Sequence, residues 1–496
     1  MGLRKSAVHL SIINAVSVTL GLVFHILLGR EFGISWELDC LFISLLIFSF
    51  FGIFNSFITS LLLPVFNEIK TKDEGEGFEF ADVVFKWSIG IGLIGWFIIQ
   101  NSGHLAIKLF ASGFDEKAVN LSNDILKILF VGYVFFNLTS SVSVILNSLY
   151  YFFIPTFVGL LAPLLNIAAV FILTPEYGVK GIAISYTISN ILQSLILLSF
   201  LFINTRWRPT LKIYDHKFTK LLKQSSTAVA GVFIWSFRDI ISRNIASHLG
   251  SGAIALLSYA DKIISILSQI VISPISSIFY SRVSELISLS KSDELKNLIM
   301  RVMKVNISAA IFASAGVIVF LKPLFDILFL GSRFTSKDID ILFYLLVIEM
   351  GFFIIISFET LFVRIVYAIK RTEVVLFIAA AGVALFYVLS KVFSNLLNIY
   401  GLALSIFLTQ IPVCMLYFYF IKKHITILSK DIFYSIIKNL TLAVPFIAIG
   451  LFVNSNTKSD IVILFLWCPI WTSLYWTASR YILKEEWDIL KRKGDA

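Results

Sequence analysis

Long apolar runs separated by short polar breaks dominate the sequence. The first two runs extend from Val8 to Leu28 and from Cys40 to Leu63, and the break between them holds Gly29 and Asp39. A helix needs roughly 20 apolar residues to cross the hydrocarbon of a bilayer, and both runs meet that length. A spanning β-barrel would instead show alternating segments of about 10 residues. The sequence therefore predicts an all-α protein that crosses a membrane many times.

The composition excludes several other classes of protein. Hydrophobic residues make up 58% of the chain and charged residues 15%, so there is too little polar surface to cover a water-soluble globule. The net charge is +10, and the lysines and arginines that produce it lie mostly between the apolar runs. A nucleic-acid-binding protein instead gathers its basic residues on a soluble face. Cys40, Cys414 and Cys468 have unrelated spacings, which predicts neither a disulfide framework nor a metal site.

The apolar runs predict about fourteen membrane spans. They lie near residues 7–29, 38–69, 82–100, 125–150, 153–173, 178–203, 222–247, 254–286, 302–321, 339–368, 374–393, 399–421, 436–454 and 460–481. Lysine and arginine concentrate on alternate connections, as the positive-inside rule requires. We therefore expect both termini in the cytoplasm and a multi-pass protein of the bacterial cytoplasmic (inner) membrane.

The two halves of the chain repeat weakly. Gly33 matches Gly250 and Glu68 matches Glu285 at one and the same spacing along the chain, and Gly181 matches Gly401 at nearly that spacing. Both copies are expected to enter the membrane from the same side, which makes this a parallel repeat. The predicted parts are a six-helix lobe (1–204), a cytoplasmic linker (205–221), a second six-helix lobe (222–423), and two additional helices with a basic cytoplasmic tail (424–496).

The seventh predicted span carries three charges within two helical turns. A lone charge at the bilayer centre costs roughly 2.5–3.5 kcal/mol on insertion scales, so it is retained where it meets water, a partner or a substrate. Asp239 and Arg243 are four residues apart and can pair along one helix face, which would merely permit insertion. Arg238 is then left over, and its guanidinium suits the oxygens of a phosphate.

Other charges inside or beside predicted spans add candidates for binding and coupling. Asp261 and Lys262 are adjacent at the start of the eighth span, where Lys262 could instead snorkel to the bilayer edge. Asp39 could bind substrate or simply cap the second span. The candidates for ion coupling are Glu359, Arg364 and Glu349 in the tenth span and His25 in the first.

No cofactor or catalytic site is expected. The run from Gly90 to Gly95 has the spacing GxGxxG but lies in an apolar run without a preceding strand, so close helix packing explains it better than dinucleotide binding. The histidines do not form HExxH, and the chain lacks a GxSxG motif. We expect coupling to a proton, a monovalent ion or the membrane potential in place of a cofactor.

Several segments resemble a known family. They are Phe32-Gly33, Asp39, the 64–68 stretch Pro-Val-Phe-Asn-Glu and, above all, residues 245–262 with the Tyr-Ala-Asp-Lys sequence. These resemble the MviN/MurJ-like lipid-linked oligosaccharide flippases of the multidrug/oligosaccharidyl-lipid/polysaccharide exporter superfamily. The resemblance implies two pseudo-symmetric six-helix lobes around a central cavity, with two C-terminal helices that form a groove for the lipid tail.

The resemblance also implies a function. The chain would move a polyprenyl-pyrophosphate-linked oligosaccharide across the cytoplasmic membrane by alternating access, as a transporter and not an enzyme. Family members that move lipid II carry arginines in the first helix where this chain has Val18 and Phe24, so a surface-polysaccharide unit stays open beside a lipid II-like precursor. The expected phosphate ligands are Arg238, Arg243 and Lys262, and the expected acidic partners are Asp39, Asp239 and Asp261.

The expected partners are the lipid-linked glycan, membrane lipids and enzymes of polysaccharide or peptidoglycan assembly, with no nucleic acid, and the protein is expected to be a monomer. Two alternatives belong to other classes. One is an ion-coupled antiporter for small molecules or drugs, and the other is a membrane glycan polymerase or ligase. The longest predicted external connection, residues 101–124, is short and poor in arginine, which argues against the enzyme.

Overall fold

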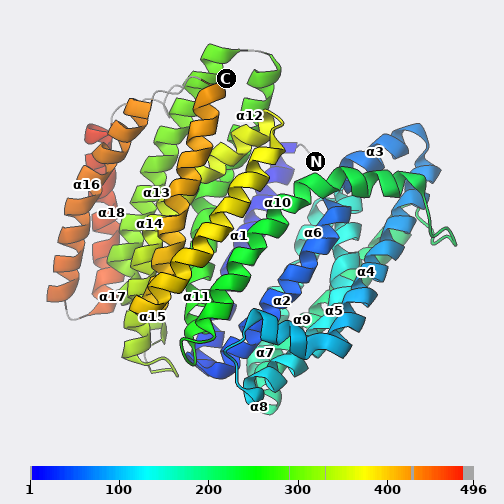
Figure 1. The fold of residues 1–496 in the computed structure, drawn as a ribbon, viewed down its shortest axis with the longest axis horizontal. Helices are drawn as coiled ribbons and strands as arrows, with labels where there is room; N and C mark the ends of the chain where they lie inside the picture. The colour runs from blue at the N-terminus through cyan, green and yellow to red at the C-terminus, as the bar shows by residue number, and fades with distance from the viewer. Residues whose placement is uncertain (1–2, 290, 330, 426–428, 458, 484–496) are drawn as a thin grey trace. The chain divides into compact units, whose positions relative to one another are not determined.

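The computed structural model describes residues 3–289, 291–329, 331–425, 429–457 and 459–483, with the side chains of these residues other than 3–9, 224–228 and 429. The last basic residues of the predicted tail lie outside the described residues. Within the described ranges every regular element is helical (Figure 1). The chain forms two compact units, residues 1–255 and 256–496.

The first unit contains ten helices of very different lengths among its described residues. They are α1 (Leu3–Phe32), α2 (Trp36–Thr59), α3 (Leu62–Lys72), α4 (Glu74–Phe110), α5 (Glu116–Ser148), α6 (Phe153–Val158), α7 (Leu161–Ile172), α8 (Thr174–Tyr177), α9 (Val179–Asn204) and α10 (His216–Ala246). Helix α10 packs against α2 and α4, which is why it belongs to this unit. The predicted lobe boundary at 205–221 stays a prediction.

Helix α5 is central to the packing of this unit, because α2, α4 and α9 all contact it. Small residues allow the close approach of α4. A Cβ on Gly92 would lie 2.6 Å from Cα of Val134, and one on Gly95 would lie 2.7 Å from the ring of Tyr133. Gly92 and Gly95 of the GxGxxG run therefore serve helix packing, whereas a Cβ on Gly90 would meet open space. The interpretation as a packing motif is confirmed for these two glycines.

The second unit contains the remaining elements. Helix α11 (Ala253–Leu267) begins at the boundary and is followed by the π-helical turn η1 (Ser268–Ile272), α12 (Ser273–Ser288), α13 (Ser292–Phe329), α14 (Ser336–Ala368), α15 (Thr372–His424), α16 (Ser429–Asn456), α17 (Asp460–Val462), the π-helical turn η2 (Ile463–Trp467) and α18 (Cys468–Ile482). The two C-terminal segments join the unit on α13, which contacts α16, α17 and η2, and α16 also contacts α18.

The number of spans agrees with the prediction. Among the described residues, twelve helices are long and apolar enough to cross a membrane. One of them, α15, contains Asn398 at φ 51° and ψ −132°, so it consists of two helices joined at a kink. Helix α10 has 31 residues but is less apolar, since it carries Arg238, Asp239 and Arg243. Counting α15 as two helices and adding α10 gives about fourteen membrane-spanning helices. The protein is a multi-pass membrane protein.

The two units repeat the same rare backbone conformations. Tyr150 has φ 66° and Lys370 has φ 60°, although a positive φ is uncommon outside glycine. Gly178, at φ 55° and ψ −141°, matches Asn398 almost angle for angle. Both pairs have the same spacing along the chain as the matched glycines of the sequence repeat, Gly181 and Gly401. The weak sequence repeat is therefore a repeat of structure.

The matched glycines Gly181 and Gly401 also meet the same steric requirement in each unit. A Cβ on Gly181 would lie 2.8 Å from the carbonyl carbon of Leu173, and one on Gly401 would lie 1.9 Å from the carbonyl oxygen of Phe393. In both places the chain turns back so tightly that a side chain has no room. This steric requirement explains why the motif is recognisable in both halves.

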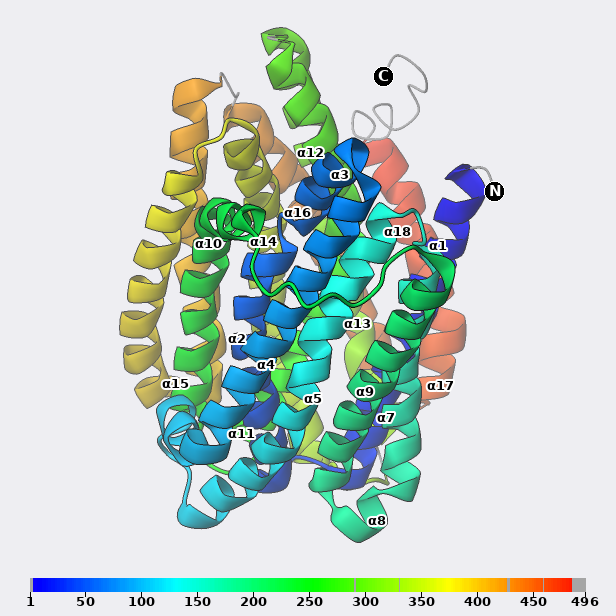
Figure 2. The same ribbon diagram turned by 90° about the vertical axis from the view of Figure 1, so that its right-hand side faces the viewer.

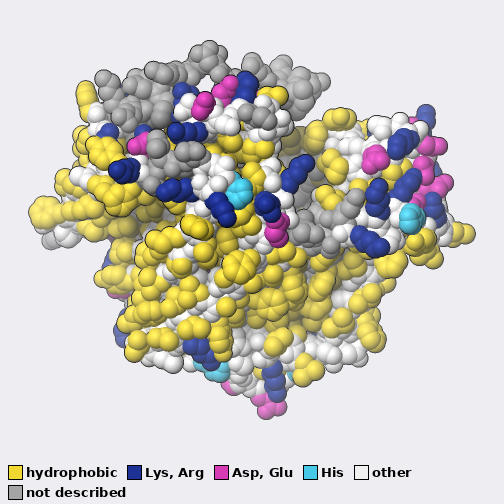
Figure 3. All heavy atoms as spheres, turned by 45° about the horizontal axis from the view of Figure 1, so that its top comes forward, with side chains coloured by type: hydrophobic (Ala, Val, Ile, Leu, Met, Phe, Trp, Pro, Cys, Tyr) yellow, Lys and Arg dark blue, Asp and Glu magenta, His cyan; other side chains and the backbone are white. Residues whose placement is uncertain are grey.

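The surface of the protein suits a bilayer. Figure 3 shows hydrophobic side chains over a broad part of the face in view, whereas most of the charged side chains in view gather outside that part. Exposed aliphatic and aromatic residues such as Leu105, Phe171 and Ile278 would be costly in water. In hydrocarbon the same residues meet lipid chains.

Candidate functional site

Asp39 is a buried carboxylate near the start of α2, with 3% of its surface exposed. Its helix is capped by Ser35, which accepts the N–H of Leu38. Asp39 instead accepts the N–H of Gly252 at 2.5 Å and the N–H of Ala255 at 2.7 Å. These amides belong to the start of α11, where helix N–H groups lack intrahelical acceptors. The alternative that Asp39 caps its own helix is therefore wrong.

The turns before α2 and α11 pack directly on each other. Gly252 has φ +84°, and a Cβ there would lie 2.1 Å from Cγ2 of Ile34 and 3.1 Å from its carbonyl oxygen. Gly33, one residue before Ile34, also has a positive φ, at 61°. Two glycine turns thus bring the Gly252 amide within reach of Asp39. The repeated segments noted in the sequence contact each other at this point.

The ends of α4 and α10 are linked by polar contacts. The hydroxyl of Ser112 lies 2.9 Å from Nε2 of His248 and 3.2 Å from Oδ1 of Asn244. The N–H of Gly113 donates to Oγ of Ser247 at 2.9 Å. A Cβ on Gly113 would lie 2.5 Å from the Ser247 carbonyl oxygen, so the loop after α4 lies tightly against the end of α10.

Arg238 is oriented by its neighbours on α10. Its Nε and Nη2 donate to Oδ1 of Asp239 at 3.2 and 3.0 Å. Its guanidinium carbon lies 5.8 Å from the ring centre of Trp235. The Arg238 side chain is 24% exposed and that of Asp239 is 48% exposed, so neither is sealed from a ligand. The predicted pairing of Asp239 with Arg243 stays a prediction, and Arg243 is half-buried one turn further along.

The remaining candidate of the first unit is His25 on α1. It is half-buried, and its ring lies 5.3 Å from that of Phe24. Phe24 in turn packs edge-on against Tyr186 of α9 at 6.5 Å. The imidazole therefore lies beside an aromatic ring of its own helix.

In the second unit, Asp261 and Lys262 lie on α11, where Asp261 is exposed and Lys262 half-buried. Adjacent residues on a helix point about 100° apart, which accounts for this difference. Tyr259 anchors the same helix, since it is buried with its ring 5.6 Å from that of Phe334. Their roles in substrate binding stay predictions.

Two buried glutamates lie on α14. Glu349 is 2% exposed and Glu359 is 6% exposed. The amide of Gln410, on α15, donates to Oε2 of Glu359. A buried carboxylate needs such donors, because losing its water shell without replacement is costly. Gln410 is therefore part of the candidate coupling site.

Arg364, also on α14, contacts α12. Its Nε donates to Oγ of Ser276 at 3.2 Å, and its guanidinium carbon lies 5.4 Å from the ring centre of Tyr280. The contact fixes the arginine against a neighbouring helix. Within the second unit, α14 therefore contacts two different helices through these side chains. Glu359 lies beside Gln410 of α15, and Arg364 lies beside Ser276 of α12.

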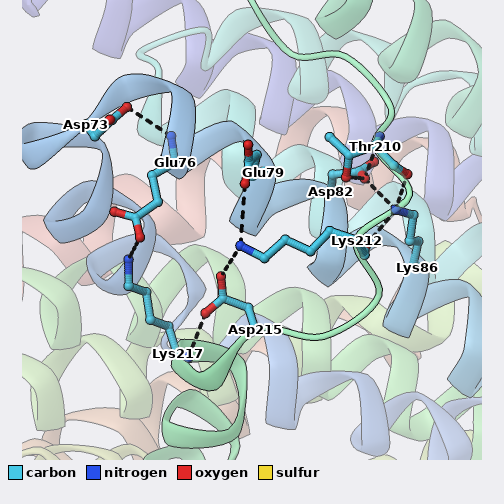
Figure 4. A network of polar contacts seen from close by, with 9 residues as sticks. All are labelled: Asp73, Glu76, Glu79, Asp82, Lys86, Thr210, Lys212, Asp215 and Lys217. Carbon is cyan, nitrogen blue, oxygen red and sulfur yellow. Dashed lines mark hydrogen bonds and ion pairs between the residues drawn. The ribbon is translucent and has the colours of Figure 1, made fainter.

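A network of polar contacts fastens the linker to α4 (Figure 4). Asp82, 3% exposed, accepts the N–H and the hydroxyl of Thr210 at 2.9 and 2.7 Å and the ammonium of Lys86 at 2.7 Å. Lys86 also donates to the carbonyl oxygens of Thr210 and Lys212. Figure 2 shows the linker crossing its neighbours before it enters α10. Asp82 is the hub of this fastening.

The network continues to the start of α10. Lys212 pairs with Asp215 at 3.1 Å and with Glu79 at 3.4 Å, and Lys217 pairs with Glu76. The hydrogen bond to Asp215 raises the pKa of Lys212 above its ordinary value. Although partial burial acts in the opposite direction, the Lys217 amide and the Lys212 ammonium hold the pKa of Asp215 below its ordinary value. Both groups are therefore charged at neutral pH.

Among the residues that the structure describes, no group of three or more histidine, cysteine or acidic side chains lies close enough together to hold a metal ion. The candidate site consists of separate charged side chains at helix ends and on helix faces.

Comparison with known proteins identifies the family. The sequence model described as "Lipid II flippase MurJ" matches residues 30–469, which is most of the chain. The chain belongs to the MurJ lipid II flippase family. A probable lipid II flippase MurJ from Buchnera aphidicola subsp. Schizaphis graminum is 27% identical over 381 residues, covering 72% of this chain and 71% of that protein. The resemblance noted in the sequence is confirmed.

Two solved structures share the fold of this chain. A lipid II flippase MurJ in an inward closed conformation matches with a TM-score of 0.80 at 21% identity, covering 96% of this chain and 99% of that one. An inward-facing multidrug resistance MATE family transporter of the MOP superfamily matches with a TM-score of 0.74 at 16% identity, covering 82% of this chain and 94% of that one. The predicted fold class is confirmed, and the family is one of transporters.

Three features of this MurJ family member were not foreseen from its sequence. Asp82 and Lys86 are four residues apart and could have been noticed as a helical pair, as could the polar residue Gln410 inside an apolar run. The contact of Asp39 with the start of α11 leaves no such signal, because its partners are backbone amides. The candidate charges themselves were all visible in the sequence.

Proposed function

We propose that this protein moves a polyprenyl-pyrophosphate-linked oligosaccharide across the cytoplasmic membrane by alternating access, with lipid II as the first candidate cargo. The MurJ family match over residues 30–469 is the observation that carries this proposal. A pyrophosphate and its sugars cannot cross hydrocarbon unaided, because their desolvation is too costly. A protein interior with cationic side chains removes that barrier.

The proposed phosphate ligands are Arg238, Arg243 and Lys262. Arg238 is the best supported, because Asp239 orients its guanidinium while part of the side chain stays exposed. An oriented arginine fork can bind two phosphate oxygens at once. Asp39, Asp239 and Asp261 are proposed to orient these cations or to bind sugar hydroxyls.

The first test replaces Arg238. Arg238→Ala is expected to abolish export while the protein inserts normally, because the variant loses the phosphate fork. Export is measured as survival of cells that depend on this chain, and membrane insertion as its amount in washed membranes. Arg206→Ala is the matched control, since Arg206 is an exposed linker arginine that pairs with Glu74. Export by Arg238→Ala at the control's rate would refute the assignment.

A second test identifies the cargo. The chain is expressed in cells depleted of their lipid II flippase and, separately, in cells that lack an O-antigen flippase. Rescue of the first strain supports lipid II, and rescue of the second alone supports a surface-polysaccharide unit. Rescue of neither favours the small-molecule antiporter, the class to which the MATE neighbour belongs.

We further propose that transport is coupled to a proton, a monovalent ion or the membrane potential through α14. Glu359 and its partner Gln410 support this role best, with Arg364, Glu349 and His25 as further candidates. Glu359→Gln is expected to remove the dependence of transport on an imposed gradient in proteoliposomes. Gln410→Glu serves as its counterpart, because it keeps a polar side chain but introduces a second acid.

The proposed setting is a monomer with both termini in the cytoplasm. The charge distribution supports this orientation. Connections between spans alternate between the two sides of the membrane, and the basic linker and the connection near Lys370 fall in one set, whereas the short loops after α4 and α13 fall in the other. By the positive-inside rule, the basic set is the cytoplasmic one. Enzymes that assemble peptidoglycan or polysaccharide are proposed as functional partners.

A further inference from the structure

An apolar pocket of about 590 Å³ lies in the second unit, among α14, α15 and α16. Its wall is formed by hydrophobic side chains together with one cation. The lining residues include Phe362 of α14, Cys414, Met415 and Phe418 of α15, and Lys430 and Phe433 of α16. The size is within the range of sites that hold a small organic ligand.

The pocket arises because α16 packs on α13 with one face and leaves another face toward α14 and α15 open. This helix packs on α13, with Ser435 and Asn439 fully or nearly buried on the packed face. Phe433 and Ile436 lie on another face of the same helix and line the pocket. The opposite wall is firm, because the rings of Phe362 and Phe418 pack 5.9 Å apart. The space is therefore framed by packed helices.

The mouth of the pocket lies on a surface that faces lipid. Met415 and Phe433, which line it, are each 65% exposed, and Tyr419, one turn from Met415, is 73% exposed. Because α14, α15 and α16 are all membrane spans, such side chains meet acyl chains and not water. An occupant that enters from this side comes from the lipid phase, where acyl chains are the most abundant species.

One end of the pocket is cationic. Lys430 lines it in the first turn of α16, and Lys422 and Lys423 lie in the last turn of α15. The first turn of α16 also carries Asp431, so the local balance remains positive. Lysines at the end of a span attract the phosphate of an anionic lipid. The apolar cavity and the charged rim together match an amphiphile with a negative headgroup.

We propose that this pocket is a binding site for an anionic phospholipid, which places one acyl chain in the pocket and its phosphate on Lys430. The lining residues include none of the proposed cargo ligands, since Arg238 and Arg243 belong to the other unit and Lys262 lies on α11 outside the lining. A bound lipid would fill the gap that α16 leaves beside α14 and α15.

The test uses the full-length protein in nanodiscs with a phosphatidylglycerol that carries a diazirine in one acyl chain. After illumination, cross-linked peptides are mapped by mass spectrometry, and a phosphatidylcholine with the same chain is the comparison. Cross-linking is expected on peptides that contain Cys414 and Phe433, several-fold stronger for phosphatidylglycerol.

Two variants separate chain from headgroup. Cys414→Trp is expected to reduce cross-linking several-fold by filling the pocket, whereas Tyr419→Trp, on the lipid-facing surface outside it, leaves cross-linking unchanged. Lys430→Gln is expected to abolish the preference for phosphatidylglycerol, and Lys370→Gln, an exposed lysine elsewhere in the unit, to keep it. The melting temperature of each variant shows whether it is folded.

Three results would overturn the proposal. Equal labelling of the whole outer surface would indicate ordinary lipid contact, and an unchanged preference in Lys430→Gln would remove the headgroup from the site. Displacement of the probe by a polyprenyl phosphate at concentrations where unlabelled phosphatidylglycerol fails would assign the pocket to the cargo tail. None of these results depends on whether Arg238 binds the cargo.

Discussion

Asp39 connects two helix starts through its carboxylate, so its replacement tests that connection. Asp39→Ala removes the acceptor of two buried amides, those of Gly252 and Ala255. Each amide left unsatisfied is expected to cost about 1–3 kcal/mol of the free energy of unfolding. The melting temperature of the purified protein in detergent should fall accordingly. Asp39→Asn should fall less, because its amide oxygen still accepts one of the two bonds.

The control for Asp39 is its neighbour on the same helix turn. Glu37 is half-buried, and Glu37→Ala is expected to leave the melting temperature nearly unchanged. If Asp39→Ala and Glu37→Ala had the same melting temperature, the two hydrogen bonds of Asp39 would contribute nothing to stability.

Gly252 provides a second test of the same contact, from the opposite side. Gly252→Ala should be more destabilising than Gly250→Ala, although both glycines have a positive φ. At Gly250 the added Cβ meets open space, so only backbone strain of about 1–2 kcal/mol is expected. At Gly252 the Cβ also overlaps Ile34. Equal melting temperatures of the two variants would show that the turns can separate at no cost.

The sequence pointed to Asp39 but not to its partners. An acidic residue beside an apolar run is conspicuous, and Gly250 stood out as the match of the nearby Gly33. The hydrogen bonds join positions that are far apart in the chain and end on main-chain amides, which have no side-chain signature. In the same way Glu359 was predictable as an intramembrane acid, but its contact with Gln410 required the packing of α14 on α15.

The linker gives a prediction about a whole segment. Asp82→Ala removes three hydrogen bonds at once, and the freed Lys86 can no longer bridge to the linker in the same geometry. We expect faster cleavage by trypsin after Arg206 and Lys212, because cleavage requires the segment to leave α4. Disappearance of the intact chain on a gel measures the rate.

The matched control for the linker is Glu74→Ala. It breaks the pair with Arg206, whose side chain is 83% exposed, and such exposed pairs contribute little. Its rate of cleavage should equal that of the unaltered protein. A rate for Asp82→Ala no faster than for Glu74→Ala would mean that the buried hub does not hold the linker.

The helices were predicted better than the interruptions within them. The gap predicted between spans 374–393 and 399–421 coincides with the kink at Asn398, because its polar neighbours end one apolar run there. The single run 254–286 instead contains α11, the π-helical turn η1 and α12. A π-helical turn changes the hydrogen-bond pattern without changing the hydropathy, so an apolar run does not reveal it.

The repeat relates the two units of the molecule and also predicts their common orientation. Tyr150 with Lys370 and Gly178 with Asn398 show that equivalent turns recur at one fixed spacing along the chain. If the repeat is parallel, equivalent positions in the two units face the same side of the membrane. An inverted repeat would place them on opposite sides, so labelling from one side distinguishes the two arrangements.

Single cysteines provide this test. Glu116 and Ser336 are exposed, equivalent positions at the starts of α5 and α14, and Leu211 is 98% exposed in the linker. In a chain whose three native cysteines are replaced by alanine, Glu116→Cys and Ser336→Cys should react with a membrane-impermeant maleimide added to spheroplasts. Leu211→Cys should react only after the membrane is permeabilised, because the basic linker is expected in the cytoplasm. Opposite labelling of Glu116→Cys and Ser336→Cys would rule out the parallel repeat, and labelling of Leu211→Cys in intact spheroplasts would reverse the orientation.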